Sequence, residues 1–151
     1  MADHDTDNLS IREMQPADAE SVARLTAELG YERSTADIRM WIERSATVRD
    51  RQVAFVACLG AEVVGWIEIS LERRLQSADF ALIGGLVVSR RHRSRGIGRR
   101  LCERADAWSW EHGATKVRVT SRSTRADAHR FYAREGFEQV KTSMVFEKKR
   151  P

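Results

Sequence analysis

Residues 86–101 read Leu-Val-Val-Ser-Arg-Arg-His-Arg-Ser-Arg-Gly-Ile-Gly-Arg-Arg-Leu, an apolar strand that runs into a basic turn and then opens a helix. The first amides of a helix have no intrahelical partners, and the helix dipole adds positive charge there. Gly96 and Gly98 carry no Cβ, so a ligand can approach the backbone closely. Six arginines lie between Arg90 and Arg100. The stretch therefore predicts a site for a phosphorylated, acidic ligand at a helix N-terminus.

Two familiar phosphate-binding loops do not match this stretch. A Walker loop ends in Gly-Lys-Ser/Thr, whereas Gly98 is followed by two arginines. A dinucleotide fingerprint has a third glycine where this chain has Leu101. The spacing that does match is Arg93-x-x-Gly96-x-Gly98, which resembles the acetyl-CoA pyrophosphate loop of the GNAT superfamily of acyl-CoA-dependent N-acetyltransferases.

This resemblance implies how the chain would hold acetyl-CoA as its co-substrate. Backbone amides and arginine charge would bind the pyrophosphate, and the strand before the loop would pair with the pantetheine arm. The amide of Val87 or Val88 would hold the thioester oxygen. The cofactor-binding residues expected here are Leu86, Val87, Val88, Arg93, Ser94, Arg95, Gly96, Ile97, Gly98 and Arg99.

A second motif lies downstream, where residues 128–137 read Ala-His-Arg-Phe-Tyr-Ala-Arg-Glu-Gly-Phe. It is similar to the A-x-x-x-Y-x-x-x-G-F signature of the same superfamily. The apolar spacing is helical, and Gly136 would end the helix. The resemblance places Tyr132 beside the coenzyme sulfur, where its phenol could protonate the departing thiolate. A tyrosine that only packs and binds the coenzyme is the alternative.

The general base is not identified by either motif. Related enzymes often carry a glutamate on the strand that leads to the loop, and Leu82 stands at that place here. Glu68 is our candidate because it lies in an apolar strand, where burial would raise the pKa of its carboxyl. Glu72, Asp79 or an ordered water remain alternatives.

A further departure from the family pattern follows the strand predicted at residues 116–120. Many relatives have an asparagine at its end, but Arg122 stands there in this chain. Ser121 or Ser123 could take over its hydrogen bonds, and Ser123 is added to the predicted coenzyme contacts. We expect the first two helices to build the acceptor pocket with Tyr31, Glu32 and Trp41.

The order of predicted elements indicates the fold. Apolar alternation, cap residues and glycines give β-α-α-β-β-β-α-β-α-β-β. This order predicts an α/β fold with a mixed, mostly antiparallel sheet and about four helices, which is also the GNAT order. The strands are expected at 9–14, 53–59, 63–71, 80–89, 116–120, 137–140 and 143–148. Gly84-Gly85 predicts a bulge or a close backbone approach.

Composition narrows the class of protein. A chain of 151 residues suits a single domain over 1–151, with residues 1–8 as a flexible N-terminal arm. We expect no membrane span, no secretion signal and no metal site, and therefore a cytoplasmic protein with its two cysteines reduced in the core. The net charge of +4 is accounted for by the arginine run.

The function expected from these observations is acetyl transfer from acetyl-CoA to a primary amine of a small molecule or an amino terminus, with Tyr132 as general acid. A homodimer is implied by the resemblance. The alternatives are a non-catalytic acyl-CoA sensor and a basic nucleic-acid-binding module. The chain has no RNA motif with interleaved aromatic residues, which makes nucleic acid the less favoured partner.

Overall fold

The computed structural model describes residues 8–151. The chain forms two compact units, Met1–Thr120 and Ser121–Pro151. The predicted arm at residues 1–8 lies, except for Asn8, outside the described residues. Among residues 8–151 no helix is both long and apolar enough to cross a membrane.

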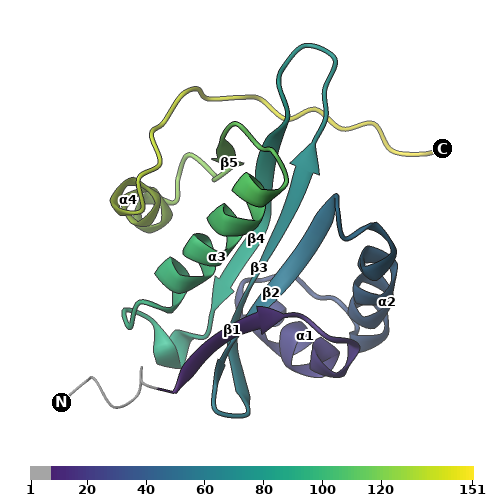
Figure 1. The fold of residues 1–151 in the computed structure, drawn as a ribbon, viewed down its shortest axis with the longest axis vertical. Coiled ribbons are helices and arrows are strands. Elements are labelled where there is room, and N and C mark those ends of the chain that lie inside the picture. Colours follow the sequence, from purple (N-terminus) through teal and green to yellow (C-terminus); the bar gives the residue numbers. More distant parts are fainter. Residues whose placement is uncertain (1–7) are drawn as a thin grey trace. The chain divides into compact units, whose positions relative to one another are not determined.

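The first unit is built on a five-stranded sheet (Figure 1). Its strands lie in chain order, and every neighbouring pair is antiparallel except the last, which is parallel. The strands are β1 (Leu9–Glu13), β2 (Gln52–Leu59), β3 (Glu62–Glu72), β4 (Phe80–Val88) and β5 (Val117–Val119). The predicted mixed, mostly antiparallel sheet is confirmed.

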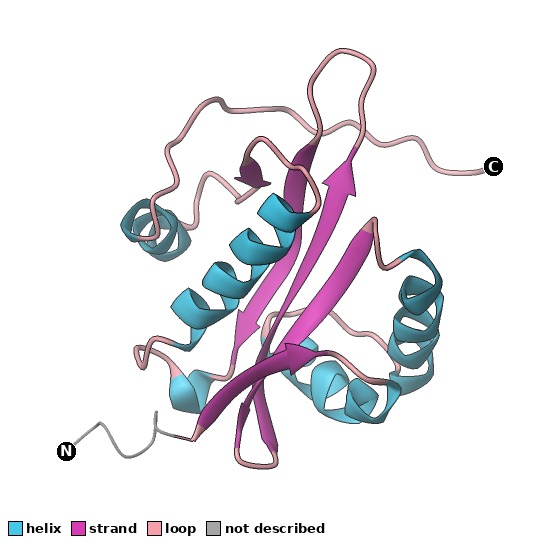
Figure 2. Cartoon of the chain, in the orientation of Figure 1, coloured by secondary structure: helices cyan, strands magenta, loops and turns pink. Residues whose placement is uncertain are grey.

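Helices cover both faces of this sheet (Figure 2). The helices α1 (Ala19–Glu28) and α2 (Thr35–Ser45) pack on the face that carries Ala54, Val56 and Cys58. The helix α3 (Ile97–Glu111) lies on the other face, where Arg104 covers the ring of Phe55. Short 3₁₀ turns occupy Pro16–Asp18, Ala46–Val48 and Arg90–His92. Because both faces are covered, the central strands are apolar on both sides, and the predicted core thiols, Cys58 and Cys102, are buried.

Local sequence signals set the ends of the helices. Ser34 and Asp37, three residues apart, predict a cap at the start of α2, and the hydroxyl of Ser34 accepts a hydrogen bond of 3.0 Å from the Asp37 amide. Gly30 and Gly113 follow α1 and α3 with φ angles of +96° and +82°. An L-residue rarely adopts that left-handed conformation, so glycine is required where these two helices end.

The predicted irregularity at Gly84-Gly85 is a β-bulge. Glu68 pairs with Gly85, and the next residue, Ile69, pairs with Ile83, so Gly84 has no partner in the register. The parallel pairing of β4 with β5 ends at the same place, since its last partners are Ile83 and Val119. The sheet therefore divides at Gly84, and β4 continues to Val88 paired with β3 alone within residues 8–120.

The second unit contains one helix, α4 (Ala126–Arg134). Two expectations about it are wrong. The strands predicted at 137–140 and 143–148 are absent, because residues 137–151 have no regular secondary structure. Apolar alternation marks one face of a strand, but a strand also needs a partner for its amides and carbonyls, and this segment has none among the described residues. Thr124 and Asp127, three residues apart, predict a cap for this helix, but its N-cap is Arg125, which makes no side-chain cap hydrogen bond.

Candidate active site

The basic turn between β4 and α3 has the conformation of an anion-binding loop. Ser94 and Gly96 have positive φ angles of 65° and 78°, and α3 begins at Ile97. The first hydrogen bond of the helix runs from the Arg100 amide to the Gly96 carbonyl at 3.1 Å. The amides of Ile97 and Gly98 precede that bond, at the positive end of the helix dipole.

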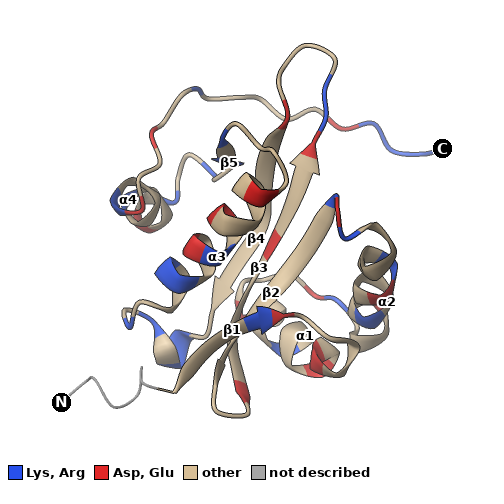
Figure 3. Ribbon diagram, in the orientation of Figure 1, with Lys and Arg blue, Asp and Glu red and all other residues tan. Residues whose placement is uncertain are grey.

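Space and charge at this loop fit a diphosphate. A Cβ built on Gly96 would meet no atom within 4 Å, so the backbone lies open to a ligand. Ile97 anchors the helix start in the core and is only 2% exposed. Figure 3 shows the cations gathered where α3 begins, and they include the exposed Arg93, Arg95 and Arg99. Arg99 also pairs with the exposed carboxylate of Glu103 at 3.2 Å. Arg90 is committed elsewhere, because its guanidinium donates to the carbonyl of Glu28 at 3.0 Å.

The strand that leads into the loop has one edge not used by the sheet. Leu86, Val87 and Val88 pair with β3 through Ile67, Trp66 and Gly65, whereas the β5 pairing ends earlier, at Ile83. In an antiparallel strand, alternate amides and carbonyls point to opposite edges. Within residues 8–120 the outer edge of these three residues is unpaired, so it can pair with an extended ligand.

Glu68 lies at the point where the sheet divides. Its cross-strand neighbours are Ala54 on β2 and Gly85 on β4, and it shares a sheet face with Trp66. A Cβ built on Gly84 would lie 2.8 Å from Oε2 and 3.0 Å from Cδ of Glu68, so the carboxylate rests against the Gly84 backbone. Burial raises the pKa of this carboxyl above its ordinary value of 4.5. No side chain among residues 8–151 forms a hydrogen bond or an ion pair with it.

The other two candidate bases have partners. The carboxylate of Glu72 lies 3.9 Å from the Arg74 guanidinium, and that of Asp79 lies 3.4 Å from the Arg73 guanidinium. Both residues flank the turn between β3 and β4 rather than the bulge. Glu68 is therefore the candidate best placed to receive a proton from a bound cation.

Trp66 is held beside Glu68 by the second glycine of the pair. A Cβ built on Gly85 would lie 2.7 Å and 2.8 Å from two carbons of the indole benzo ring. The indole nitrogen of Trp66 is buried and has no hydrogen-bond partner in the described part of the chain. Gly84 and Gly85 thus make room for two different side chains of β3.

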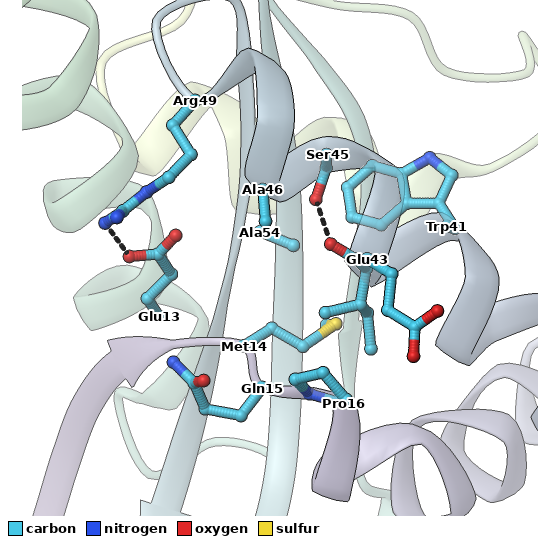
Figure 4. A pocket seen from close by; sticks show the side chains of 11 residues that line it. Glu13, Met14, Gln15, Pro16, Trp41, Glu43, Ser45, Ala46, Arg49 and Ala54 are labelled. Carbon is cyan, nitrogen blue, oxygen red and sulfur yellow. Dashed lines mark hydrogen bonds and ion pairs between the residues drawn. The ribbon is translucent and has the colours of Figure 1, made fainter.

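A cavity of about 390 Å³ opens on the same face of the sheet (Figure 4). Met14, Trp41 and Ala54 contribute to its wall, and Ala54 is the cross-strand neighbour of Glu68. The ion pair between Glu13 and Arg49 closes one side. The full lining is Glu13, Met14, Gln15, Pro16, Trp41, Ile42, Glu43, Ser45, Ala46, Arg49 and Ala54.

The structure thus brings one of the three predicted acceptor residues to this cavity. Trp41 is half-buried and lines it, whereas Tyr31 and Glu32 are exposed between α1 and α2 and do not. Sequence reasoning missed the contributions of Met14 and Arg49. Neither residue belongs to a motif, and both reach the cavity only through the pairing of β1 with β2 and the packing of α2.

The four histidines are scattered along the sequence and form no motif, which predicts surface positions. His92 is instead only 8% exposed, and its Nδ1 has no partner among the described residues. Its amide donates to the Ser89 carbonyl at 2.9 Å within the turn that precedes the loop. The ring is therefore part of the support beneath the arginines. His4 lies outside the described residues.

Tyr132 and Ser123 belong to the second unit. Tyr132 is half-buried on α4, and its ring contacts those of Phe131 and Phe137 edge to face, at centroid distances of 5.4 Å and 5.6 Å. Gly136 follows the helix with a φ of +90°, as its place in the motif predicts. Ser123 is exposed in the segment before the helix.

Comparison with known proteins identifies relatives over most of the chain. The profile of the Acetyltransferase (GNAT) family matches residues 17–137. An aminoalkylphosphonate N-acetyltransferase of Salmonella typhimurium is 34% identical over 97 residues, which span 63% of each chain, just under two thirds. A type 1 aminoglycoside N(6')-acetyltransferase of Stenotrophomonas maltophilia is 26% identical over 91% of each chain.

A solved structure shares the fold. AAC(6')-Iy, in complex with the bisubstrate analogue CoA-S-monomethyl-acetylneamine, superposes with a TM-score of 0.82 at 17% identity. The match covers 93% of this chain and 98% of the other. At that identity the likeness establishes the fold, and the site must be argued from the residues of this chain.

Proposed function

The chain belongs to the acetyltransferase (GNAT) family, and we propose that it transfers the acetyl group of acetyl-CoA to a primary amine of a small molecule. Membership confirms the family and the class of enzyme, an acetyl-CoA-dependent N-acetyltransferase, that the two motifs predict. The two relatives are named for small amine acceptors, an aminoalkylphosphonate and an aminoglycoside. The amino-terminal acceptor, the homodimer and the cytoplasmic location remain predictions.

The observation that carries the proposal is the coincidence of three features on one strand. The carboxylate of Glu68 rests against β4 at Gly84, the outer edge of β4 is free of β5 from that point, and the anion-binding loop follows at the end of the strand. A coenzyme that lies along this edge, with its diphosphate at the loop, directs its other end toward Glu68. Acetyl-CoA supplies the activated acyl group in this arrangement.

The residues at the loop hold the diphosphate. The amides of Ile97 and Gly98 donate hydrogen bonds at the helix N-terminus, and Arg93, Arg95 and Arg99 neutralise charge. The backbone of Leu86, Val87 and Val88 binds the pantetheine arm as an added strand. The sequence predicts a further contact to this arm from the hydroxyl of Ser123, a residue of the second unit.

Glu68 prepares the acceptor. An amine is protonated at neutral pH and has no lone pair for attack, so a base must remove a proton before the C–N bond forms. A carboxylate that is half-buried and without a partner gains an ion pair when an ammonium binds, and its raised pKa makes it a better base than an exposed glutamate. At the cavity, the charge of Glu13 is paired with Arg49, and the exposed Glu43 adds negative potential for the same cation.

Tyr132 completes the proton transfers. Its phenol donates a proton to the sulfur as the C–S bond breaks and the C–N bond forms, and solvent returns that proton to the phenolate. A positioned acid of this kind contributes typically about 10²–10⁴-fold. This role depends on the place of Tyr132 in the second motif.

The test is a panel of amines assayed by release of free coenzyme thiol. The panel comprises an aminoalkylphosphonate, an aminoglycoside, a polyamine and an amino-acid amide, and at least one is expected to give turnover that falls with Glu68→Gln. Acetyl-CoA binding in calorimetry without turnover on any amine would favour a coenzyme sensor. RNA binding with a steep salt dependence and no coenzyme binding would favour the nucleic-acid module.

A further inference from the structure

The two glycines of the bulge are not explained by backbone conformation. Positive φ angles occur at Gly30, Gly60, Gly96, Gly113 and Gly136, and neither Gly84 nor Gly85 is among them. Any residue could adopt their backbone, so the reason for glycine must be space. At Gly84 that space is filled by the carboxylate of Glu68, since a Cβ there would lie 2.8 Å from Oε2.

A contact this close is relieved only by movement, and the group that can move is the flexible end of the Glu68 side chain. Real Cβ atoms essentially never approach another atom within 3.0 Å, so any side chain at position 84 would displace the carboxylate. The displaced group would leave the point at which β4 separates from β5. The carboxylate of Glu68, a residue of β3, thus occupies the space where the Cβ of a side chain at position 84 of β4 would lie.

We propose that Gly84 is the positioning residue for Glu68, and that a carboxylate placed at position 84 would serve the same role. This inference rests on the proposed function, in which Glu68 accepts the proton of the amine. It also accounts for the chain having no glutamate on β4, where Leu82 stands at the expected place. The carboxylate comes from the neighbouring strand, and the bulge glycine admits it.

No charged side chain lies next to Glu68 on its face of β2, β3 or β4. The residues that face Glu68 are uncharged: Ala54 on β2, Gly84 and Gly85 on β4, and Trp66 and Ser70 on its own strand. Glu72, two residues beyond Ser70, lies 3.9 Å from the guanidinium of Arg74. The charged residues of α1 and α2, on the same face, are Glu20, Arg24, Glu28, Asp37, Arg39, Glu43 and Arg44, and none shifts the pKa of Glu68, which burial alone raises.

The experiment compares alanine at the two adjacent glycines. Gly84→Ala is expected to lower kcat by about tenfold or more and to shift the acidic limb of log(kcat/KM), while acetyl-CoA affinity stays within about twofold. Gly85→Ala displaces Trp66 instead and is expected to leave the acidic limb in place. Carboxyl ¹³C NMR titration of Glu68 gives the same comparison without turnover: its pKa should move in Gly84→Ala and not in Gly85→Ala.

A transplanted carboxylate keeps the proposal testable if Gly84→Ala folds poorly. In the double variant Glu68→Ala/Gly84→Asp, the new carboxyl begins from the Cβ that lies 3.0 Å from the present Cδ. The kcat of this double variant should exceed that of Glu68→Ala by at least about tenfold. Its pH profile of kcat/KM should show an acidic limb, which the control Glu68→Ala/Gly84→Asn should lack. Melting curves of all variants check the fold.

The outcomes separate this inference from the proposed function. Unchanged activity in Glu68→Gln removes Glu68 as the base and overturns the inference, whereas the proposed acetyl transfer fails only if no amine of the panel gives turnover. A strong effect of Glu68→Gln, with a wild-type pH profile and NMR titration in Gly84→Ala, overturns the inference alone. Failure of the aspartate to recover more activity than the asparagine also overturns it.

Discussion

The guanidinium of Arg12 and the carboxylate of Asp18 form two hydrogen bonds, of 2.7 Å and 2.8 Å, across the junction between β1 and α1. Asp18 is only 6% exposed, and it also accepts a bond of 2.7 Å from the Gln15 amide. Burial opposes ionisation of Asp18, but these bonds outweigh it and keep the pKa of the carboxyl below its ordinary value of 3.8. The pair thus fixes the turn that forms one wall of the cavity.

Asp18→Asn should lower the free energy of unfolding by about 1–3 kcal/mol, because bonds to a charged acceptor in a buried setting are lost. The pKa of Asp18 is depressed in the folded state, so its contribution is present above pH 3.8 and disappears as the pH falls through the folded pKa. Urea unfolding at pH 7 and pH 3 measures the difference. Asp37→Asn, which breaks the exposed pair with Arg33, is the control and should cost below about 0.5 kcal/mol.

Glu68→Gln should have the opposite effect on stability. The pKa of Glu68 is raised by burial, so the folded state binds the proton more tightly, and the benefit is lost as the pH rises from 4.5 through the folded pKa. At pH 7 the variant should be more stable than the wild type, by about 1.4 kcal/mol for each unit by which the pKa is raised. The gain should vanish below pH 4.5, and an equal gain in Glu72→Gln would contradict the assignment.

The kinetic effect of Glu68→Gln should depend on pH. If Glu68 takes the proton of the ammonium, the rate deficit is largest where the amine is protonated and shrinks as the pH rises through the pKa of the substrate amine. The pH profile of kcat/KM measures this. A deficit that stays constant across pH would assign Glu68 to substrate positioning instead.

Gly96→Val should weaken acetyl-CoA binding by tenfold or more (about 1.4 kcal/mol) in calorimetry. Two causes act together: the φ of +78° strains an L-residue, and the added side chain fills the space in which the diphosphate would lie. Gly113→Val is a matched control, since Gly113 has a φ of +82° and equally open surroundings at the other end of α3. Both variants should lose similar stability, but only the first should lose affinity.

Tyr132→Phe should lower kcat by about 10²-fold or more with acetyl-CoA affinity nearly unchanged. The ring contacts with Phe131 and Phe137 are retained in this variant, so α4 should keep its packing. The basic limb of the kcat profile should disappear with the phenol. Normal turnover with an intact basic limb would leave Tyr132 a packing residue.

Much of the first unit could be predicted because its signals are local. The cap of Ser34 depends on residues three apart, and the bulge at Gly84 follows from two glycines in an apolar strand. The start of α3 is marked by Gly96, whose positive φ ends one element and begins the next. In each case the chain within a few residues determines the geometry.

What could not be predicted depends on partners distant in the sequence. The contact of Glu68 with Gly84 requires the register of β3 against β4, which no periodicity reveals. The burial of His92 depends on what packs over the turn. The strands expected at 137–140 and 143–148 have the alternation but no partner within the described chain, and their apolar residues Val140, Met144 and Phe146 are between 75% and 88% exposed.

Because β4 separates from β5 at Gly84, the remaining residues of β4 set the distance between Glu68 and the basic turn. From Gly84 to Val88 the strand advances about 13 Å, at roughly 3.3 Å per residue, between the carboxylate of Glu68 and the basic turn. An inserted residue in this span would lengthen the interval by one step and turn every following side chain to the opposite face. In the proposed arrangement the donor spans this interval between the basic turn and Glu68, so the strand can change its side chains but not its residue count.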